Sequence, residues 1–246
     1  DFKWNMGWMN DSLDYLEVDP FFRKGSHDKF TFSMCYAFSE NYILPISHDE
    51  VVHGKKSLLD KAPVAYGDKF SNFKAFLGYM FAHPGKKLTF MGVDIAQFIE
   101  WDEERQLDWF LLLYPKHSFN QRYVKELNKY YKSTPALWQN DCDWNGFRWH
   151  VVDDNTNNVF AFSRIDNSGK EVLVVSNFSG QILKGYEIGV DTWGSYKISL
   201  NSDAKKYDGT ALQNRNLKTL NKKKNNFQYT LSVNIPPYAT MYIEKK

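Results

Sequence analysis

The 246-residue chain is long enough for one large domain or two ordinary ones, and its 43% hydrophobic and 24% charged residues are typical of a folded soluble protein. Its 31 basic and 29 acidic residues leave a formal charge of +2, which gives no electrostatic basis for a nucleic-acid or membrane-surface partner. No apolar run approaches the roughly 18 to 20 residues that a membrane-spanning helix needs.

The first part of the chain, up to about Asp143, alternates predicted strands with predicted helices. The predicted strands are Phe2 to Met6, Tyr42 to Ile46 and Lys87 to Gly92. The predicted helices are Ser12 to Val18 with Asn10 or Asp11 as its N-cap, Phe30 to Glu40, Asp68 to Ala82 and Phe119 to Lys132. This alternation is typical of a parallel sheet or of part of a barrel.

The rest of the chain shows short strands separated by turn sequences, with no helical pattern between them. The predicted strands are Phe147 to Asp153, Val159 to Arg164, Glu171 to Phe178, Tyr186 to Val190, Ser195 to Leu200 and Phe227 to Ile243. This pattern predicts an antiparallel β-sandwich or barrel. It places a boundary near Asp143, between a domain of residues 1–143 and a domain of residues 144–246. The basic run Lys218 to Lys224 is predicted to be a solvated loop.

Two features of the chain concern its compartment and its origin. Cys35 and Cys142 fall in segments of different character, and the chain begins with no signal-like stretch. We therefore expect free thiols in a reducing compartment, which indicates a cytoplasmic protein. The chain also starts without an initiator methionine and inside an apparent strand, which suggests a boundary set by cloning.

The stretch Leu44 to Lys56 carries the strongest chemical signal. The apolar strand before it stops at the four polar residues Ser47-His48-Asp49-Glu50, and parallel α/β folds place their chemistry on loops at such strand ends. A metal site is one interpretation, but His48 and His53 are five residues apart, which suits neither a helix face nor one side of a strand. A second interpretation is that His48 and Asp49 simply cap the next element.

The third interpretation is carbohydrate chemistry. Retaining cleavage of a glycosidic bond needs two carboxylates about 5 to 5.5 Å apart on opposite sides of the anomeric carbon. Asp49 and Glu50 cannot be that pair, because neighbours on an extended chain point to opposite faces. Asp49 can still hold substrate hydroxyls and stabilise developing positive charge, with His48 donating a hydrogen bond beside it.

Longer runs of sequence carry a more specific signal than the His-Asp pair. These runs are Lys3 to Asp11, Leu44 to Ser57, Pro84 to Gly92, Glu100-Trp101, Leu107 to Trp109, Leu173 to Phe178 and Leu200 to Asp203. Together they resemble the glucan-branching members of the alpha-amylase superfamily, glycoside hydrolase family 13. The resemblance covers essentially the whole chain.

The resemblance implies cleavage of an α-1,4-glucan chain with retention and transfer to a 6-hydroxyl, which makes α-1,6 branches in glycogen and needs no cofactor or metal. Asp49 would be the carboxylate that stabilises the transition state, and His48 would bind sugar hydroxyls. Glu50, Trp101 and Asp94 would contact the substrate, Trp101 by stacking on a glucan ring. The partner is then an α-glucan such as glycogen or an amylose-type chain.

The same resemblance implies an incomplete active site. The family's nucleophile and acid/base lie on the fourth and fifth barrel strands, and no segment of this chain matches their motifs. The expected fold is α/β plus all-β: about strands 6–8 of a (β/α)8 barrel, followed by an antiparallel β-sandwich. Such a chain is expected to be inactive alone. Three strands cannot close an eight-stranded barrel, so we also expect self-association through the exposed partial-barrel surface.

One local departure and two alternatives stay open. After Phe90-Met91-Gly92 the family usually continues Asn-Glu-Phe, whereas this chain has Val93-Asp94-Ile95, so its contacts at the rim of the eighth strand are in question. His53, Lys55 and Lys56 are interpreted as loop-ordering residues without a catalytic role. The alternatives are an amylase-like α-glucan hydrolase, with water as the acceptor, and a non-catalytic glucan-binding module. Taken alone, residues 145–246 favour a purely structural β domain.

Overall fold

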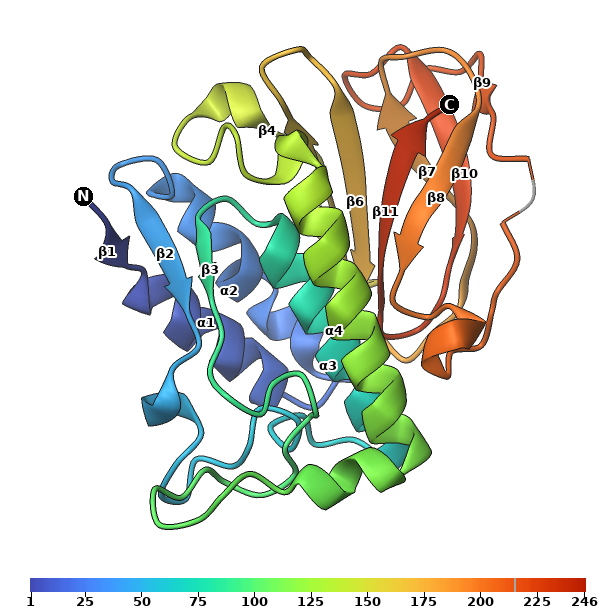
Figure 1. Cartoon of the computed structure of the whole chain (residues 1–246). Helices are drawn as coiled ribbons and strands as arrows, with labels where there is room; N and C mark the ends of the chain where they lie inside the picture. The colour runs from blue at the N-terminus through green and yellow to red at the C-terminus, as the bar shows by residue number, and fades with distance from the viewer. Residues whose placement is uncertain (215) are drawn as a thin grey trace.

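The computed structural model describes residues 1–214 and 216–246 and joins a short parallel sheet with its helices to two antiparallel sheets (Figure 1). The parallel sheet has the order β1-β2-β3, formed by Lys3–Trp4, Tyr42–Pro45 and Lys86–Leu88. Both neighbouring pairs run parallel, which requires crossover connections. Helix α1 (Met6–Glu17) lies in the first connection and helix α3 (Tyr66–Ala82) in the second.

Further helical elements complete this half of the molecule. They are α2 (Asp28–Thr31), α4 (Pro115–Ser133) and the 3-10 turns Arg23–Ser26, Phe32–Cys35, His48–Glu50, Trp109–Leu113, Pro135–Leu137 and Trp144–Gly146; one further 3-10 turn, Lys205–Tyr207, lies in the β region. Within residues 1–214 and 216–246, none of the helices is both long enough and apolar enough to cross a bilayer.

The C-terminal half is antiparallel throughout. Its strands are β4 (Phe147–Asp154), β5 (Val159–Ile165), β6 (Glu171–Asn177), β7 (Leu183–Val190), β8 (Tyr196–Asn201), β9 (Thr219–Leu220), β10 (Tyr229–Ile235) and β11 (Ala239–Lys245). A five-stranded sheet has the order β4-β5-β6-β11-β8, and a three-stranded sheet has the order β7-β10-β9. Apolar residues from both sheets, such as Val175 of β6 and Leu231 of β10, share one buried cluster. The predicted antiparallel sandwich is therefore confirmed.

Several predicted elements differ from the structure. The predicted strand Lys87 to Gly92 ends at Leu88, and the predicted solvated loop Lys218 to Lys224 contains the short strand β9, which pairs with β10. Helix α1 begins at Met6 rather than Ser12, because Asn5 is its N-cap and accepts a 2.9 Å hydrogen bond from the backbone nitrogen of Trp8. The predicted helix from Phe30 to Glu40 is wrong, since only α2 and a 3-10 turn form there. The predicted strand from Phe227 to Ile243 is two strands, divided at Pro236-Pro237, where proline supplies no N–H to a ladder.

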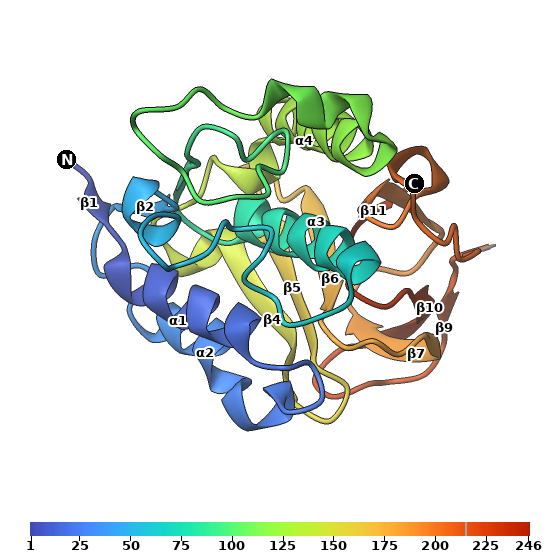
Figure 2. The same ribbon diagram turned by 90° about the horizontal axis from the view of Figure 1, so that it is seen from below.

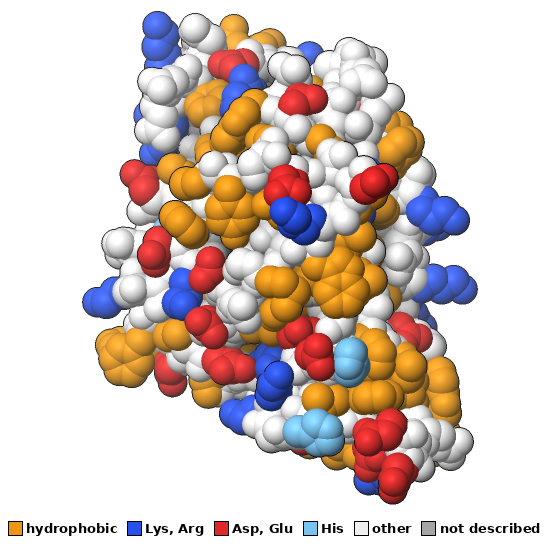
Figure 3. Space-filling model, turned by 90° about the vertical axis from the view of Figure 1, so that its left-hand side faces the viewer, with side chains coloured by type: hydrophobic (Ala, Val, Ile, Leu, Met, Phe, Trp, Pro, Cys, Tyr) orange, Lys and Arg blue, Asp and Glu red, His pale blue; other side chains and the backbone are white. Residues whose placement is uncertain are grey.

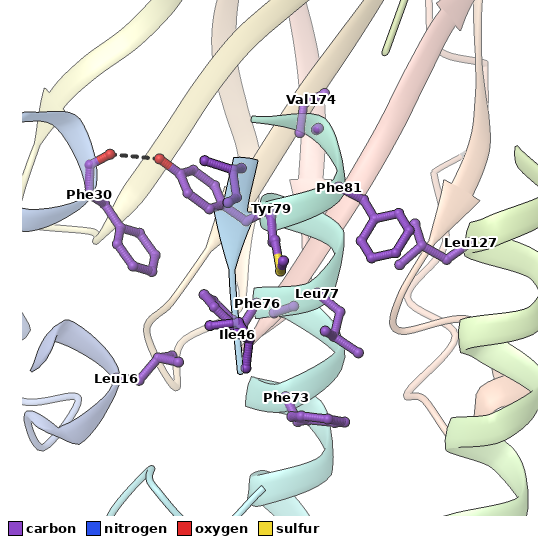
Figure 4. Close-up of a cluster of buried hydrophobic side chains, with 14 of the residues drawn as sticks. Leu16, Phe30, Ile46, Phe73, Phe76, Leu77, Tyr79, Phe81, Leu127 and Val174 are labelled. Atoms are coloured by element: carbon purple, nitrogen blue, oxygen red, sulfur yellow. Dashed lines mark hydrogen bonds between the residues drawn. The ribbon is translucent and has the colours of Figure 1, made fainter. Parts of the chain in front are cut away.

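Helix α3 joins the two halves. Figure 2 shows it between α1 and α2 on one side and α4 on the other, against the five-stranded sheet. In Figure 4 its side chains point both toward Phe30 and Leu16 and toward Leu127 of α4 and Val174 of β6. Polar contacts fix the same packing: the Tyr79 hydroxyl donates to the Phe30 carbonyl at 2.6 Å, and the hydroxyl of Tyr242 in β11 donates to the Gly78 carbonyl at 2.6 Å.

Close approach of α3 to the sheet depends on Gly78. A β-carbon there would lie 2.8 Å from the Tyr123 hydroxyl and 2.9 Å from Cβ of Thr240. We expect Gly78→Ala to lower the free energy of unfolding by about 1–3 kcal/mol, because overpacking moves the helix away from the sheet. The measurement is the denaturant midpoint. Gly67→Ala in the first turn of α3 is the matched control and should change stability by less than about 1 kcal/mol, since its nearest atom is the Lys116 ammonium at 3.9 Å. Equal losses in both variants would contradict this account.

Two fully buried arginines also link the halves. Arg23 donates to the side-chain oxygen of Asn72 in α3 and to the carbonyl of Phe178 after β6, both at 2.9 Å. Arg164 of β5 donates to the carbonyl of Ala82 at 2.7 Å and pairs with Asp141, also at 2.7 Å. Buried charges persist only when their hydrogen bonds are satisfied, so these contacts set how the two halves dock.

Candidate functional site

A tight turn presents His48 and Asp49 at the end of β2. Ser47 and Glu50 form a capping box: the Glu50 carboxylate accepts from the Ser47 backbone nitrogen at 2.6 Å and from its hydroxyl at 2.8 Å. Both of these residues are buried, whereas the side chains of His48 and Asp49 are 52% and 64% exposed. His48 Nε2 lies 3.2 Å from Asp49 Oδ1, so the imidazole and the carboxylate are exposed to solvent as a pair.

Trp101 joins this pair, and Asp94 does not. The Trp101 ring centroid is 6.0 Å from that of His48 and 5.1 Å from that of Phe90, both edge to face. The Trp101 backbone nitrogen donates to the Val51 carbonyl at 2.9 Å, which ties the two loops together. Among the residues described, no hydrogen bond or ion pair links the Asp94 side chain to His48, Asp49 or Trp101. The backbone carbonyl of Asp94 instead accepts a hydrogen bond from the Asn120 side chain at 2.8 Å, which fixes the turn that contains Asp94.

Glu100 fixes the loop beside the pair, whereas the sequence named it only within the Glu100-Trp101 run and predicted no role for it. One carboxylate oxygen accepts from the backbone nitrogen of Gly54 at 2.9 Å, and the other accepts from that of Lys56 at 2.7 Å. This loop needs such support, because His53 and Lys56 both have φ in the left-handed region, at 49° and 64°. The hydrogen bonds from Gly54 and Lys56 hold the pKa of Glu100 below its ordinary value.

Two lysines extend the support to Asp49. The Lys55 ammonium donates to the Asp49 carbonyl at 2.7 Å. The buried Lys61 ammonium donates to the Lys55 carbonyl at 2.8 Å and pairs with Glu17 of α1 at 3.2 Å. The loop is thus connected to both α1 and the Asp49 backbone. These contacts agree with the interpretation of Lys55 and Lys56 as loop-ordering residues.

The Glu100 carboxylate provides a direct test of this loop. In Glu100→Gln the side-chain NH2 opposes one of the two backbone N–H groups, so we expect the amides of Gly54 and Lys56 to exchange with solvent about tenfold faster, as measured by NMR. Glu103→Gln is the matched control on the same loop and should leave both rates unchanged. Because the pKa of Glu100 is lowered in the fold, its support is present near neutral pH and is lost as pH falls through that pKa. Unaltered exchange in Glu100→Gln would refute the assignment.

The loop from His53 to Lys56 separates two grooves. One has a volume of about 580 Å³ and is lined by Asp49, Glu50, Lys55, Lys61 and one face of α1. The other has a volume of about 750 Å³ and is lined by residues Phe98 to Arg105, which include Trp101, and by His53 and Asp60. Figure 3, which faces the side where β1 and β2 lie, shows histidine side chains beside acidic and hydrophobic ones. Within residues 1–214 and 216–246, no group of three or more His, Cys, Asp or Glu is placed to hold a metal ion.

Known proteins match the chain along its length. Residues 149–246 fit the family model described as the alpha amylase C-terminal all-beta domain. The 1,4-alpha-glucan branching enzyme GlgB of Halothermothrix orenii is 44% identical over 99% of the chain, that of Photobacterium profundum 46% over 100%, and that of Aquifex aeolicus 48% over 98%. The chain is a relative of the branching enzymes.

The branching enzymes are much longer than this chain, which spans 39%, 34% and 39% of those three relatives. Solved structures resemble it at low identity. AmyP in complex with maltose has a TM-score of 0.65 at 12% identity, over 99% of this chain and 49% of its own. The alpha-amylase from H. orenii has a TM-score of 0.55 at 13% identity, over 100% of this chain and 49% of its own. At this identity the likeness shows the fold alone.

Proposed function

We propose that this chain is the C-terminal part of a 1,4-alpha-glucan branching enzyme. The full-length protein would cleave an α-1,4-glucan chain with retention and transfer it to a 6-hydroxyl to form an α-1,6 branch in glycogen. The observation that carries the proposal is 44–48% identity to branching enzymes over 98–100% of the chain, a match whose range covers the turn that presents His48 and Asp49. The chemistry uses carboxylates, so the proposal requires no cofactor.

In this proposal Asp49 stabilises the positive charge that develops at the anomeric carbon, and His48 donates a hydrogen bond to a sugar hydroxyl. Exposure of both side chains on a buried capping box supports these roles. Trp101 would stack on a glucan ring beside His48. A direct substrate contact by Glu50 stays a prediction, because its carboxylate first holds the turn. Asp94 also stays a prediction, as a contact farther along the chain.

We further propose that β1, β2 and β3 are strands six to eight of a (β/α)8 barrel, with a domain boundary near Asp143. Support comes from the parallel order β1-β2-β3 with helices in both connections. The nucleophile and the acid/base would then lie on segments that precede this chain in the longer relatives. Asp49 alone cannot carry out a double displacement, so the 246-residue chain is expected to be inactive.

The decisive experiment incubates the full-length protein with amylose and separates its products. We expect α-1,6 linkages, detected as short chains released by a debranching enzyme, with few new reducing ends. The 246-residue chain alone should give neither product above background. New reducing ends without α-1,6 linkages would instead establish an amylase-like hydrolase and overturn the proposal.

Two further properties are proposed on physical grounds. The three-stranded parallel sheet has open edges at β1 and β3, and exposed side chains such as Phe2 (55%) and Trp4 (45%) lie at one of them, so we propose that the separate chain self-associates. A strictly monomeric mass by light scattering at high concentration would contradict this. A cytoplasmic location is proposed from Cys35 and Cys142, which are exposed free thiols.

A further inference from the structure

We propose that the groove on the Trp101 side of the His53 to Lys56 loop binds an α-1,4-glucan chain of its own, separately from the groove that holds Asp49. This inference rests on the proposed function and specifies where a second sugar chain lies. A transferase that joins two glucans must hold a donor chain and an acceptor chain together, whereas a hydrolase holds one chain and water.

A fixed wall separates the two grooves. Gly54 and Lys55 line the Asp49 groove, His53 lines the other, and Lys56 borders both. The loop is held on the Trp101 side by the two backbone hydrogen bonds to Glu100, and on the Asp49 side by the Lys61 ammonium. A chain in one groove therefore does not merge with a chain in the other. Asp49 lines the first groove, and Trp101, which packs edge to face on His48, lines the second.

The lining of the second groove suits a sugar. Phe98 and Ile99 are 37% and 40% exposed, and with the half-buried Trp101 they offer apolar surface that matches the C–H faces of glucose rings. Charged side chains around them supply hydrogen-bond acceptors and donors for hydroxyl groups, among them Asp102, Glu103, Glu104 and Arg105. The volume of about 750 Å³ lies within the usual range of small-molecule sites, roughly 300–1,000 Å³.

The charged side chains that line this second groove limit the class of ligand that it can bind. Five carboxylates line this groove, against the two permanent cations Lys56 and Arg105. The carboxylates are Asp60, Glu100, Asp102, Glu103 and Glu104. An excess of negative charge repels phosphates and nucleic acids, whereas a neutral polyhydroxyl chain meets no such repulsion. A neutral glucan fits both the charge and the apolar surface.

The test measures binding of maltoheptaose to the 246-residue chain by titration calorimetry. We expect Phe98→Ala and Ile99→Ala, made separately, each to weaken binding at this groove about tenfold, a change of 1.4 kcal/mol. Trp101 is left intact because its ring also packs on His48. Phe32→Ala is the matched control, since Phe32 is 57% exposed and lies outside both grooves. Asp49→Asn should leave binding at this groove unchanged.

Three outcomes would overturn the proposal: no binding of maltoheptaose, binding abolished by Asp49→Asn, or binding unaltered in both groove variants. In the full-length protein the groove variants should raise the KM for an added acceptor chain while the KM for the donor stays the same. A full-length protein without branching activity, whose chain still loses maltoheptaose binding in Phe98→Ala, would refute the proposed function and leave the groove assignment intact. Normal acceptor KM in the variants of an active enzyme would refute the groove alone.

Discussion

Replacement of Arg164 by methionine is expected to lower the free energy of unfolding by about 3–5 kcal/mol. The Arg164 guanidinium is fully buried and makes five hydrogen bonds. Four go to the carbonyls of Ala82, Leu137, Asn140 and Gly146, and one goes to the Asp141 carboxylate. Methionine fills similar space but donates nothing, so buried acceptors lose their partners.

The electrostatic effect of Arg164 on Asp141 also stabilises the fold. Burial alone would raise the pKa of Asp141, but the nearby cations Lys87, Arg164 and Lys86 outweigh it and hold that pKa below its ordinary value. Removing one of these cations leaves a buried carboxylate less compensated. A carboxyl group whose pKa is lowered by folding stabilises the folded state at pH values above its ordinary pKa. We therefore expect this contribution to be lost as the pH falls through the pKa of Asp141 in the fold.

Denaturant unfolding measures the effect, and Arg148→Met is the matched control. Arg148 lies in the neighbouring strand and also pairs with two carboxylates, but its side chain is 38% exposed, so its loss should cost no more than about 1 kcal/mol. The two variants should differ in midpoint while keeping similar slopes. A loss in Arg164→Met no larger than that in Arg148→Met would show that the buried guanidinium does not fix the docking of the two halves.

In the full-length protein, Asp49→Asn is expected to lower kcat for glucan transfer about 10³-fold with little change in folding stability. Asparagine keeps the shape of the side chain but removes the negative charge that would stabilise the oxocarbenium-like transition state. The side chain is 64% exposed, so the fold does not depend on it. The measurements are kcat on amylose and the thermal midpoint, each compared with the unaltered protein.

Asp28→Asn controls for the loss of an exposed carboxylate elsewhere, at the start of α2, and should retain full activity. KM should also change little in Asp49→Asn, since the charge acts chiefly in the transition state. A kcat within about tenfold of the unaltered value would exclude Asp49 as the stabilising carboxylate.

The sequence predicted the long elements well and the local ones less well. Helix α3 was recognised because Phe70, Phe73, Phe76, Leu77 and Met80 repeat at helical spacing, and all are buried. A similar spacing after Phe30 was misleading: the Phe30 ring is buried against Tyr15, Tyr79 and Phe178, so tertiary packing rather than a helix explains its position. The two-residue strand β9 was missed because so short a segment leaves no periodic signal.

The residues of the candidate site were also predicted only in part. The exposed His48–Asp49 pair was predicted from its place after a strand. The buried, turn-capping role of Glu50 was not predicted, although the spacing Ser47-x-x-Glu50 is itself a signature of a capping box. The role of Glu100 in holding the loop was missed because its partners are backbone N–H groups of residues 44 and 46 positions away, which leave no side-chain pattern in the sequence.

The five-stranded sheet is buried on both faces, and this limits how freely its half of the molecule can be exchanged. Phe162, Val174 and Tyr242 on one face belong to the same cluster as α3, while Ala161, Val175 and Met241 on the other face the second sheet. A chimera joined near Asp143 would set the helix of one parent against the sheet of another. Recombination of this chain with relatives that are 44–48% identical to it is therefore expected to succeed only where α3 is exchanged together with the strands that it covers.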